Sequence, residues 1–172
     1  WADFFDSKKF PGKRAIRNGA KWNLEVALIA DGVPSKDVYK TLRTPEGIER
    51  AFKKLDSVKS DLVFWKSGAQ PPQMLAAGDV VFTTAYNGRI TAANEKDKKN
   101  FKMVWKDTPY TMDSFVIMKG SPKKADAEKL LEEWKDVEAV VPSLDHGVAL
   151  QPELPGDEVT IRADIWLFVV GI

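Results

Sequence analysis

The chain contains no cysteine and a single histidine among its 172 residues. Without cysteine it can form no disulfide framework, no thiolate nucleophile and no zinc site built from sulfur. The histidine, His146, follows Asp145 in a stretch that reads as a turn, and one imidazole alone makes a poor metal site. No serine stands in a recognisable nucleophile setting for a Ser-His-Asp triad. We therefore expect no enzymatic activity, no catalytic residue, no metal and no cofactor.

The sequence also lacks an excess of charge and a long hydrophobic run. Its 26 basic and 25 acidic residues give a formal net charge of +1, so binding to nucleic acid through bulk charge is not expected. The longest apolar run, residues 165–172, is far shorter than the roughly 20 residues that span a bilayer. No basic segment followed by an apolar one opens the chain, so we expect an export signal to be absent or already removed. Phosphate-binding glycine loops and hydrolase or metalloprotease motifs are missing too.

What remains is a globular composition, with 44% hydrophobic and 30% charged residues. A chain of this length supports one domain that buries about 70% of its unfolded surface, and it is short for two domains. We therefore expect a single α/β domain over residues 1–172.

Short apolar strands alternate with amphipathic helices along this domain. The expected strands are residues 13–17, 62–65, 80–85, 101–105, 113–118, 138–141 and 159–170. The expected helices are residues 23–30, a helix that begins after Thr44 at Pro45, and residues 70–77, 88–94 and 123–137. This alternation is typical of a three-layer αβα sandwich with a mainly parallel central sheet. In such sheets ligands bind beyond the carboxyl ends of the strands, where Tyr86, Asn87 and Gly88 are predicted.

Two of the helices are predicted to be amphipathic. In the helix at Pro45, Thr44 is the expected N-cap and proline takes the first helical position. The residues expected on the inner faces are Ile48, Phe52 and Leu55 in that helix, and Ala127, Leu130, Leu131 and Trp134 in the helix at 123–137. Trp22 and Trp65 are interpreted as core or lobe-interface residues, and the lysine-rich residues 95–102 as a solvated helix end and turn.

Three collinear blocks carry a family resemblance. They read WADFFDSKKFPGKRAIR, EGIERAFKKLDSVKSDLVFWKSGAQPPQMLAAGDVVFTTAYNGRI and YTMDSFVIMKGSPKKADAEKLL. Together they resemble the extracellular solute-binding proteins of bacterial ABC importers, most closely the spermidine/putrescine-binding type, over about residues 1–135. The resemblance implies one lobe of a type II periplasmic-binding-protein fold and a periplasmic location in the parent family. It also implies a second lobe and an importer permease as partners, with no nucleic acid and no membrane insertion.

The same resemblance points to a site for a small cation such as putrescine or spermidine. Tyr86 stands where the family has an aromatic residue that stacks on the ligand, and Asp113 where it has an acid that pairs with an ammonium. Glu25 matches a further carboxylate. Ring faces attract ammonium groups and carboxylates accept their hydrogen bonds. The candidate ligand-binding residues are Tyr86, Asp113, Glu25, Asn87 and Tyr110.

Simpler interpretations of these residues stay open. Tyr86 could end a strand and cap the core, Asp113 could cap a turn or pair with a lysine, and Glu25 could lie on a solvated helix face. Thr111 also occupies a position where polyamine binders often have an aromatic residue, which weakens the polyamine assignment.

Residues 138–172 diverge from the family and end in EVTIRADIWLFVVGI. We hypothesise that this tail supplies a strand to the sheet, as in a circular permutation or an engineered isolated lobe. One lobe offers one wall of a ligand clamp, so weak or no residual binding is expected. Self-association through the former cleft face, with its tryptophan and tyrosine side chains, is expected as well. The alternatives are a stand-alone or engineered α/β scaffold without a ligand and a flavodoxin-like cofactor binder.

Overall fold

A computed structural model of the chain describes residues 1–134 and 161–171. The contacts between residues divide the chain into two units. The first consists of Trp1–Pro109 and Trp166–Ile172, and the second of Tyr110–Ile165. The single-domain description of residues 1–172 stays a prediction, as does the division into a family-like part and a tail.

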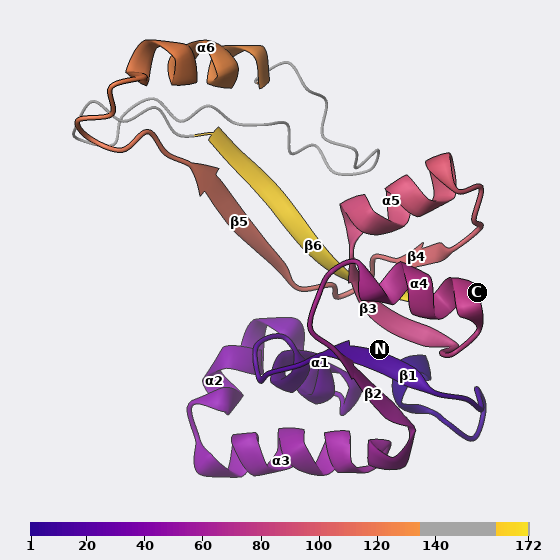
Figure 1. The fold of residues 1–172 in the computed structure, drawn as a ribbon. Helices are drawn as coiled ribbons and strands as arrows, with labels where there is room; N and C mark the ends of the chain where they lie inside the picture. The colour runs from indigo at the N-terminus through magenta and orange to yellow at the C-terminus, as the bar shows by residue number, and fades with distance from the viewer. Residues whose placement is uncertain (135–160, 172) are drawn as a thin grey trace. The chain divides into compact units, whose positions relative to one another are not determined.

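The first unit contains a sheet with strand order β2-β1-β3-β6-β4 (Figure 1). Its strands are β1 (Arg14–Arg17), β2 (Leu62–Trp65), β3 (Phe82–Tyr86), β4 (Lys102–Val104) and β6 (Ile161–Gly171). Strand β1 pairs in parallel with β2 and β3, and β6 runs antiparallel to both β3 and β4. Ala85 lies opposite Phe168, and Val104 opposite Val169. The expected mainly parallel sheet is confirmed for these three paired strands.

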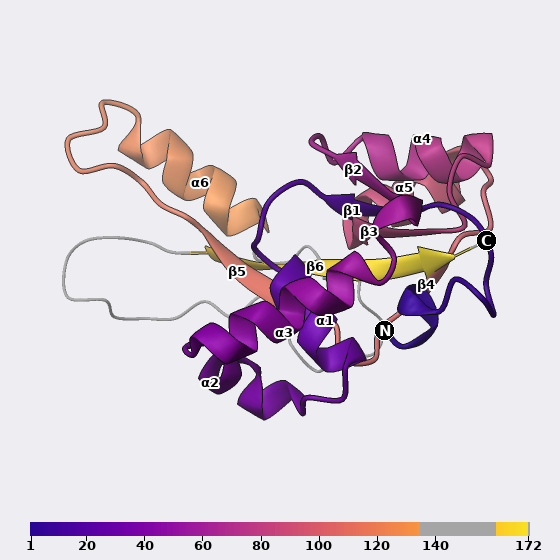
Figure 2. The same cartoon turned by 90° about the horizontal axis from the view of Figure 1, so that it is seen from below.

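Helices cover both faces of this sheet (Figure 2). They are α1 (Asn23–Ala30), α2 (Val38–Leu42), α3 (Pro45–Asp56), α4 (Gln70–Ala77) and α5 (Asn87–Lys96), with single turns of 3-10 helix at η1 (Asp3–Phe5), η2 (Ser35–Asp37) and η3 (Lys59–Asp61). Successive strand residues point to opposite faces. Ile16 therefore packs in one buried cluster with Leu28 of α1 and Ala51 of α3, whereas Ala15 packs in the other with Leu75 of α4 and Ile90 of α5. The three-layer αβα fold class is confirmed.

Helix α3 begins as expected but buries only part of the predicted face, because Leu55 packs against the core cluster whereas Ile48 and Phe52 are exposed. The Thr44 side chain accepts a hydrogen bond from the Gly47 amide at 3.1 Å, as an N-cap residue does. A Cβ atom on Gly47 would lie 1.9 Å from the Thr41 carbonyl oxygen, so α2 and α3 approach each other through glycine. The prediction that Ile48 and Phe52 face the core is wrong, because the buried residues of α3 are Gly47 and Ala51 while Phe52 is 52% exposed.

Strand β2 lies at an edge of the sheet. Its sequence LVFW predicts a buried strand, but only Trp65 is buried, and Phe64 is 55% exposed. The reason is position, because an edge strand has a neighbour on one side only and a helix layer does not fully cover it.

A buried arginine holds the N-terminal segment against β1. The Arg14 guanidinium donates three hydrogen bonds to main-chain oxygens, from Nε to Phe4 at 2.6 Å, from Nη1 to Gly12 at 2.7 Å and from Nη2 to Phe10 at 2.7 Å. Arg14 is 0% exposed. Burial lowers the pKa of Arg14, and nearby carboxylates act in the opposite direction.

The second unit contains β5 (Tyr110–Phe115) and α6 (Lys124–Trp134), and β5 pairs with β6. The strand predicted at 113–118 is displaced, since residues 116–118 are outside any strand. Within α6, Leu131 is buried as expected, but Leu130 is 54% exposed, so its predicted place on the inner face is wrong. The predicted strand at 138–141, the end of the helix predicted to residue 137 and His146 lie outside the described residues.

In the part of the chain that the structure describes, no helix is both long and apolar enough to cross a membrane. The same residues contain no group of three or more acidic or histidine side chains that could hold a metal ion.

Candidate ligand-binding site

The sheet of the first unit has a topological switch point at the carboxyl ends of β1 and β3. These two strands are neighbours, yet the chain leaves β1 toward α1 on one face and leaves β3 toward α5 on the other. Ligands of open α/β sheets bind at such a switch point. The loop of residues 17–22 and the turn at Tyr86 and Asn87 lie on its two sides. We call Arg17, Lys21, Trp22, Tyr86 and Asn87 the strand-end site.

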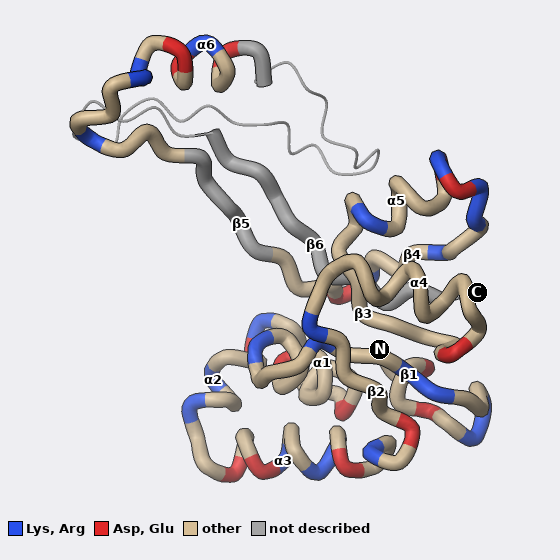
Figure 3. The backbone as a smooth tube through the Cα atoms, in the orientation of Figure 1, with Lys and Arg blue, Asp and Glu red and all other residues tan. Residues whose placement is uncertain are grey.

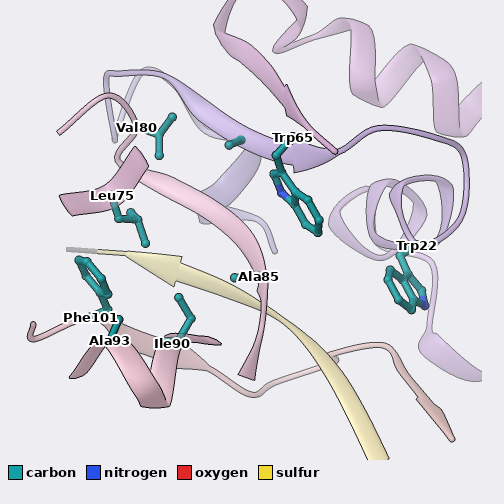
Figure 4. Packing of buried hydrophobic residues seen from close by; sticks show 9 residues of the cluster. Trp22, Trp65, Leu75, Val80, Ala85, Ile90, Ala93 and Phe101 are labelled. Atoms are coloured by element: carbon teal, nitrogen blue, oxygen red, sulfur yellow. The ribbon is translucent and has the colours of Figure 1, made fainter. Parts of the chain in front are cut away.

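Tyr86 is the centre of an aromatic cluster in this site. Its ring lies edge-on to Trp22 at 6.1 Å between centroids and to Trp65 at 5.7 Å. Figure 4 shows Trp22 and Trp65 on the same side of β3. The Trp65 indole donates a hydrogen bond to the Thr84 hydroxyl at 3.2 Å. A Cβ on Gly68 would lie 2.9 Å from the Tyr86 ring, so glycine there leaves room for it.

These contacts bear on the two interpretations of Tyr86. The ring is half-buried and packs against the hydrophobic cluster, which fits a residue that closes the core. The ring is also positioned by two neighbours at the switch point, which fits a ligand wall. Trp22 and Trp65 are core residues, with exposures of 5% and 1%. The interpretation of Trp22 and Trp65 as core residues is therefore confirmed, and self-association through the former cleft face stays a prediction.

The loop between β1 and α1 brings two cations to the Trp22 ring. The Arg17 guanidinium lies 5.6 Å and the Lys21 ammonium 4.7 Å from the ring centroid. Trp22 itself has φ 72°, a left-handed conformation that is uncommon outside glycine. The Asn23 side chain fixes the loop by donating hydrogen bonds to the Arg17 and Gly19 carbonyl oxygens at 2.6 and 2.7 Å. Among the described residues, Asn23 Oδ1 is buried without a hydrogen-bond partner.

Arg17 and Lys21 were missed by the sequence reasoning. The available signal was the stretch RNGAKWN at the end of a strand, in which two cations precede an aromatic residue. Its meaning depends on the loop conformation, because only a turned loop brings both cations to one ring.

Glu25 lies in the first turn of α1 and is half-buried. The Tyr39 hydroxyl of α2 donates a long hydrogen bond to it, with 3.5 Å between the oxygens. Partial burial and the Glu25 carboxylate together raise the pKa of Tyr39 above its ordinary value of 10.0. Glu25 therefore has an internal partner, and its role in ligand binding stays a prediction.

The remaining candidates fall into different parts of the chain. Asn87 is the first residue of α5 and lies beside Tyr86. Tyr110 and Asp113 belong to β5 in the second unit. Their participation in one site with Tyr86 stays a prediction.

The chain matches the family model described as bacterial extracellular solute-binding protein over residues 1–141. It therefore belongs to this family, whose members serve ABC importers. It is 54% identical over 131 residues to the gamma-aminobutyric acid-binding protein of Pseudomonas aeruginosa PAO1, a match that covers 76% of this chain and 37% of the relative.

Two solved structures are similar as well. The Atu4243-GABA receptor is 44% identical with a TM-score of 0.51, over 58% of this chain and 30% of that one. The PBP MotA from A. tumefaciens B6 in complex with glucopine is 42% identical with a TM-score of 0.51, over 54% and 29%. The chain thus spans roughly a third of the length of these relatives.

These relatives correct the sequence-based assignment in part. The solute-binding family is confirmed, and the relatives are transport proteins rather than enzymes. The spermidine/putrescine-binding type has no support, because the named relatives bind γ-aminobutyric acid or glucopine. Circular permutation, deliberate design and a flavodoxin-like cofactor binder gain no support either.

Proposed function

We propose that this chain is the ligand-recognition part of an ABC-importer solute-binding protein for a short zwitterionic amino acid of the γ-aminobutyrate type. The observation that carries the proposal is the 54% identity to a γ-aminobutyric acid-binding protein. The strand-end site adds a chemical reason, because it combines an aromatic wall with cations.

The charges at this site favour a zwitterion over a polyamine. A polyamine has only ammonium groups, and Arg17 and Lys21 beside the Trp22 ring would repel it. A γ-amino acid has a carboxylate at one end, and a guanidinium can bind that group through two parallel hydrogen bonds.

The rest of such a ligand suits the aromatic residues. The Tyr86 ring would cover the methylene groups and attract the ammonium end. Glu25 of the first unit is a proposed acceptor for that ammonium, and Asp113 of the second unit is a further proposed ligand residue. Each end of the ligand would then have a partner suited to its charge.

Affinity is expected to be low for this chain alone. A ligand clamped between two lobes loses contact with water on both sides, whereas one lobe supplies about half of those contacts. Much of the free-energy cost of immobilising the ligand remains. Dissociation constants on the order of millimolar or weaker follow.

The test is an NMR titration that follows the side-chain indole signals of the six tryptophans. γ-Aminobutyrate should shift the Trp22 signal at millimolar concentrations, while putrescine should not. Arg17→Gln should abolish the shift, because it removes the cation but keeps the main-chain carbonyl that Asn23 holds.

Arg43→Gln is the matched control, since this exposed arginine is at the C-terminal end of α2 and away from the strand-end site. It should bind γ-aminobutyrate like the wild type. Putrescine binding as tight as that of γ-aminobutyrate would refute the zwitterion assignment. Unchanged indole signals up to tens of millimolar would refute binding by this chain.

A further inference from the structure

A hollow lies between α4 and α5, and none of the residues of the strand-end site lines it. Its volume is about 270 Å³. Half of its ten lining residues are alanine or proline, and we call these small residues its floor: Ala69, Pro72, Ala76, Ala92 and Ala93. The two helices leave a groove open between them where these small side chains lie.

The groove is bordered by cations. Arg89, Lys96 and Lys99 line it, with Asp97 as the one acidic residue among its lining side chains. All three cations are exposed, and none forms an ion pair with another described residue. Helix α4 carries no charged residue, so the positive charge comes from α5 and the turn after it (Figure 3).

The position of Arg89 argues against a purely structural role. It is the third residue of α5, and a cation in the first helical turn is opposed by the partial positive charge of that end. Neither an ion pair nor the helix dipole therefore stabilises Arg89 where it stands. An external anion would do so.

We propose that the α4–α5 groove is a docking site for an acidic peptide segment of a protein partner. Seven residues separate Arg89 from Lys96, which corresponds to about 10 Å along the helix. A single small anion cannot contact both ends of such a span, whereas carboxylates about three residues apart on an extended peptide can. The small floor residues let the peptide backbone approach closely.

A peptide fits better than a nucleic acid. The net charge of the chain is only +1, and the residues that line the groove include no aromatic side chain on which bases could stack. The proposal does not depend on the ligand of the strand-end site.

The test measures fluorescence anisotropy of a labelled peptide of alternating glutamate and alanine, titrated with the full chain. This peptide should bind, more weakly at higher salt, and a lysine–alanine peptide of equal length should not. The triple variant Arg89→Glu, Lys96→Glu and Lys99→Glu should weaken binding at least about tenfold.

The matched control is Lys40→Glu, Arg43→Glu and Lys53→Glu, which makes the same charge change at exposed positions of α2 and α3. It should stay within about twofold of the wild type. Ala76→Phe fills the groove without changing charge and should also weaken binding of the acidic peptide. This variant keeps the proposal testable if the Arg89, Lys96 and Lys99 triple variant folds poorly.

Three results would overturn the proposal. One is equal weakening in both triple variants, which would mean that net charge alone attracts the peptide. Another is no binding of the acidic peptide at low salt. The third is a single-stranded oligonucleotide of the same charge that binds at least as tightly as the peptide.

Discussion

Replacing Arg14 by lysine should destabilise the first unit strongly. Three main-chain oxygens, those of Phe4, Phe10 and Gly12, depend on the guanidinium at 2.6 to 2.7 Å. A lysine ammonium is a compact donor and can reach one of these divergent acceptors, which leaves two of the three carbonyls without this donor. The hydrogen bond to Phe4 is buried and those to Gly12 and Phe10 are part-buried, and an unsatisfied buried group costs about 1–3 kcal/mol. We therefore expect a loss of about 2–3 kcal/mol, a substantial part of the roughly 5–15 kcal/mol that stabilises a typical domain.

The assay is urea unfolding followed by tryptophan fluorescence, compared with an Arg50→Lys control. Arg50 also donates two short hydrogen bonds, from Nε to the Asp31 carboxylate at 2.6 Å and from Nη2 to the Asp31 carbonyl at 2.8 Å. Its side chain is 47% exposed, however. Water can replace the lost contacts there, so the control should change stability by less than about 1 kcal/mol. Equal effects of the two substitutions would refute the reasoning, because Arg14 is buried and holds three separate main-chain oxygens, whereas Arg50 is exposed and contacts Asp31 alone.

Two further predictions concern the surroundings of the candidate site. Gly68→Ala should destabilise the protein by about 1–2 kcal/mol and change the near-ultraviolet circular dichroism, because its Cβ would lie 2.9 Å from the Tyr86 ring. Tyr39 should titrate above pH 10.0, and Glu25→Gln should lower its pKa only in part, since burial is the largest single cause and remains in the variant. The stability that neutral Tyr39 contributes is complete below pH about 10 and is lost as pH rises through the raised pKa.

Each has a control. Gly88→Ala adds a methyl group where nothing lies within 4 Å, so stability should stay equal or rise, as helix propensity predicts. An equal loss at both glycines would contradict the packing argument. For Tyr39, the control is Tyr39→Phe, which lacks this phenol. The difference between the tyrosinate absorbance of the wild type and that of the variant gives the titration of Tyr39. A Tyr39 midpoint that Glu25→Gln leaves unchanged would show that the carboxylate does not act on the phenol.

The layered fold was predictable because local signals agreed with it. Thr44 and Pro45 mark the start of α3, and the apolar stretch before Tyr86 marks β3. These signals act within a few residues of the chain. The sequence reasoning therefore located most elements of the first unit within a few residues.

Features that depend on neighbours in space were harder to predict. The spacing of Ile48 and Phe52 suggests a buried face, yet α3 packs through Gly47 and Ala51 because these small residues allow close approach. Likewise, nothing in the spacing of Arg17 and Lys21 shows that both reach the Trp22 ring.

The candidate site was also predicted only in part. Tyr86 and Asn87 were found because they stand at the end of a predicted strand, and ligands bind at the carboxyl ends of parallel strands. The polyamine type gained no support from the relatives, and the sequence reasoning chose it because aromatic residues and carboxylates suit any ammonium. In the proposed function, the cations of the β1–α1 loop favour a zwitterion over a polyamine.

The strand order has a consequence for the sequence of folding events. Strand β4 joins the described sheet only through β6, which comes more than fifty residues later in the chain. During synthesis, β1, β2 and β3 can pair as soon as Tyr86 has emerged, whereas β4 must wait for the last strand. Contacts between distant segments form slowly. An intermediate with α4 and α5 in place and the edge of β3 unpaired is therefore expected, and this intermediate is the species most exposed to aggregation.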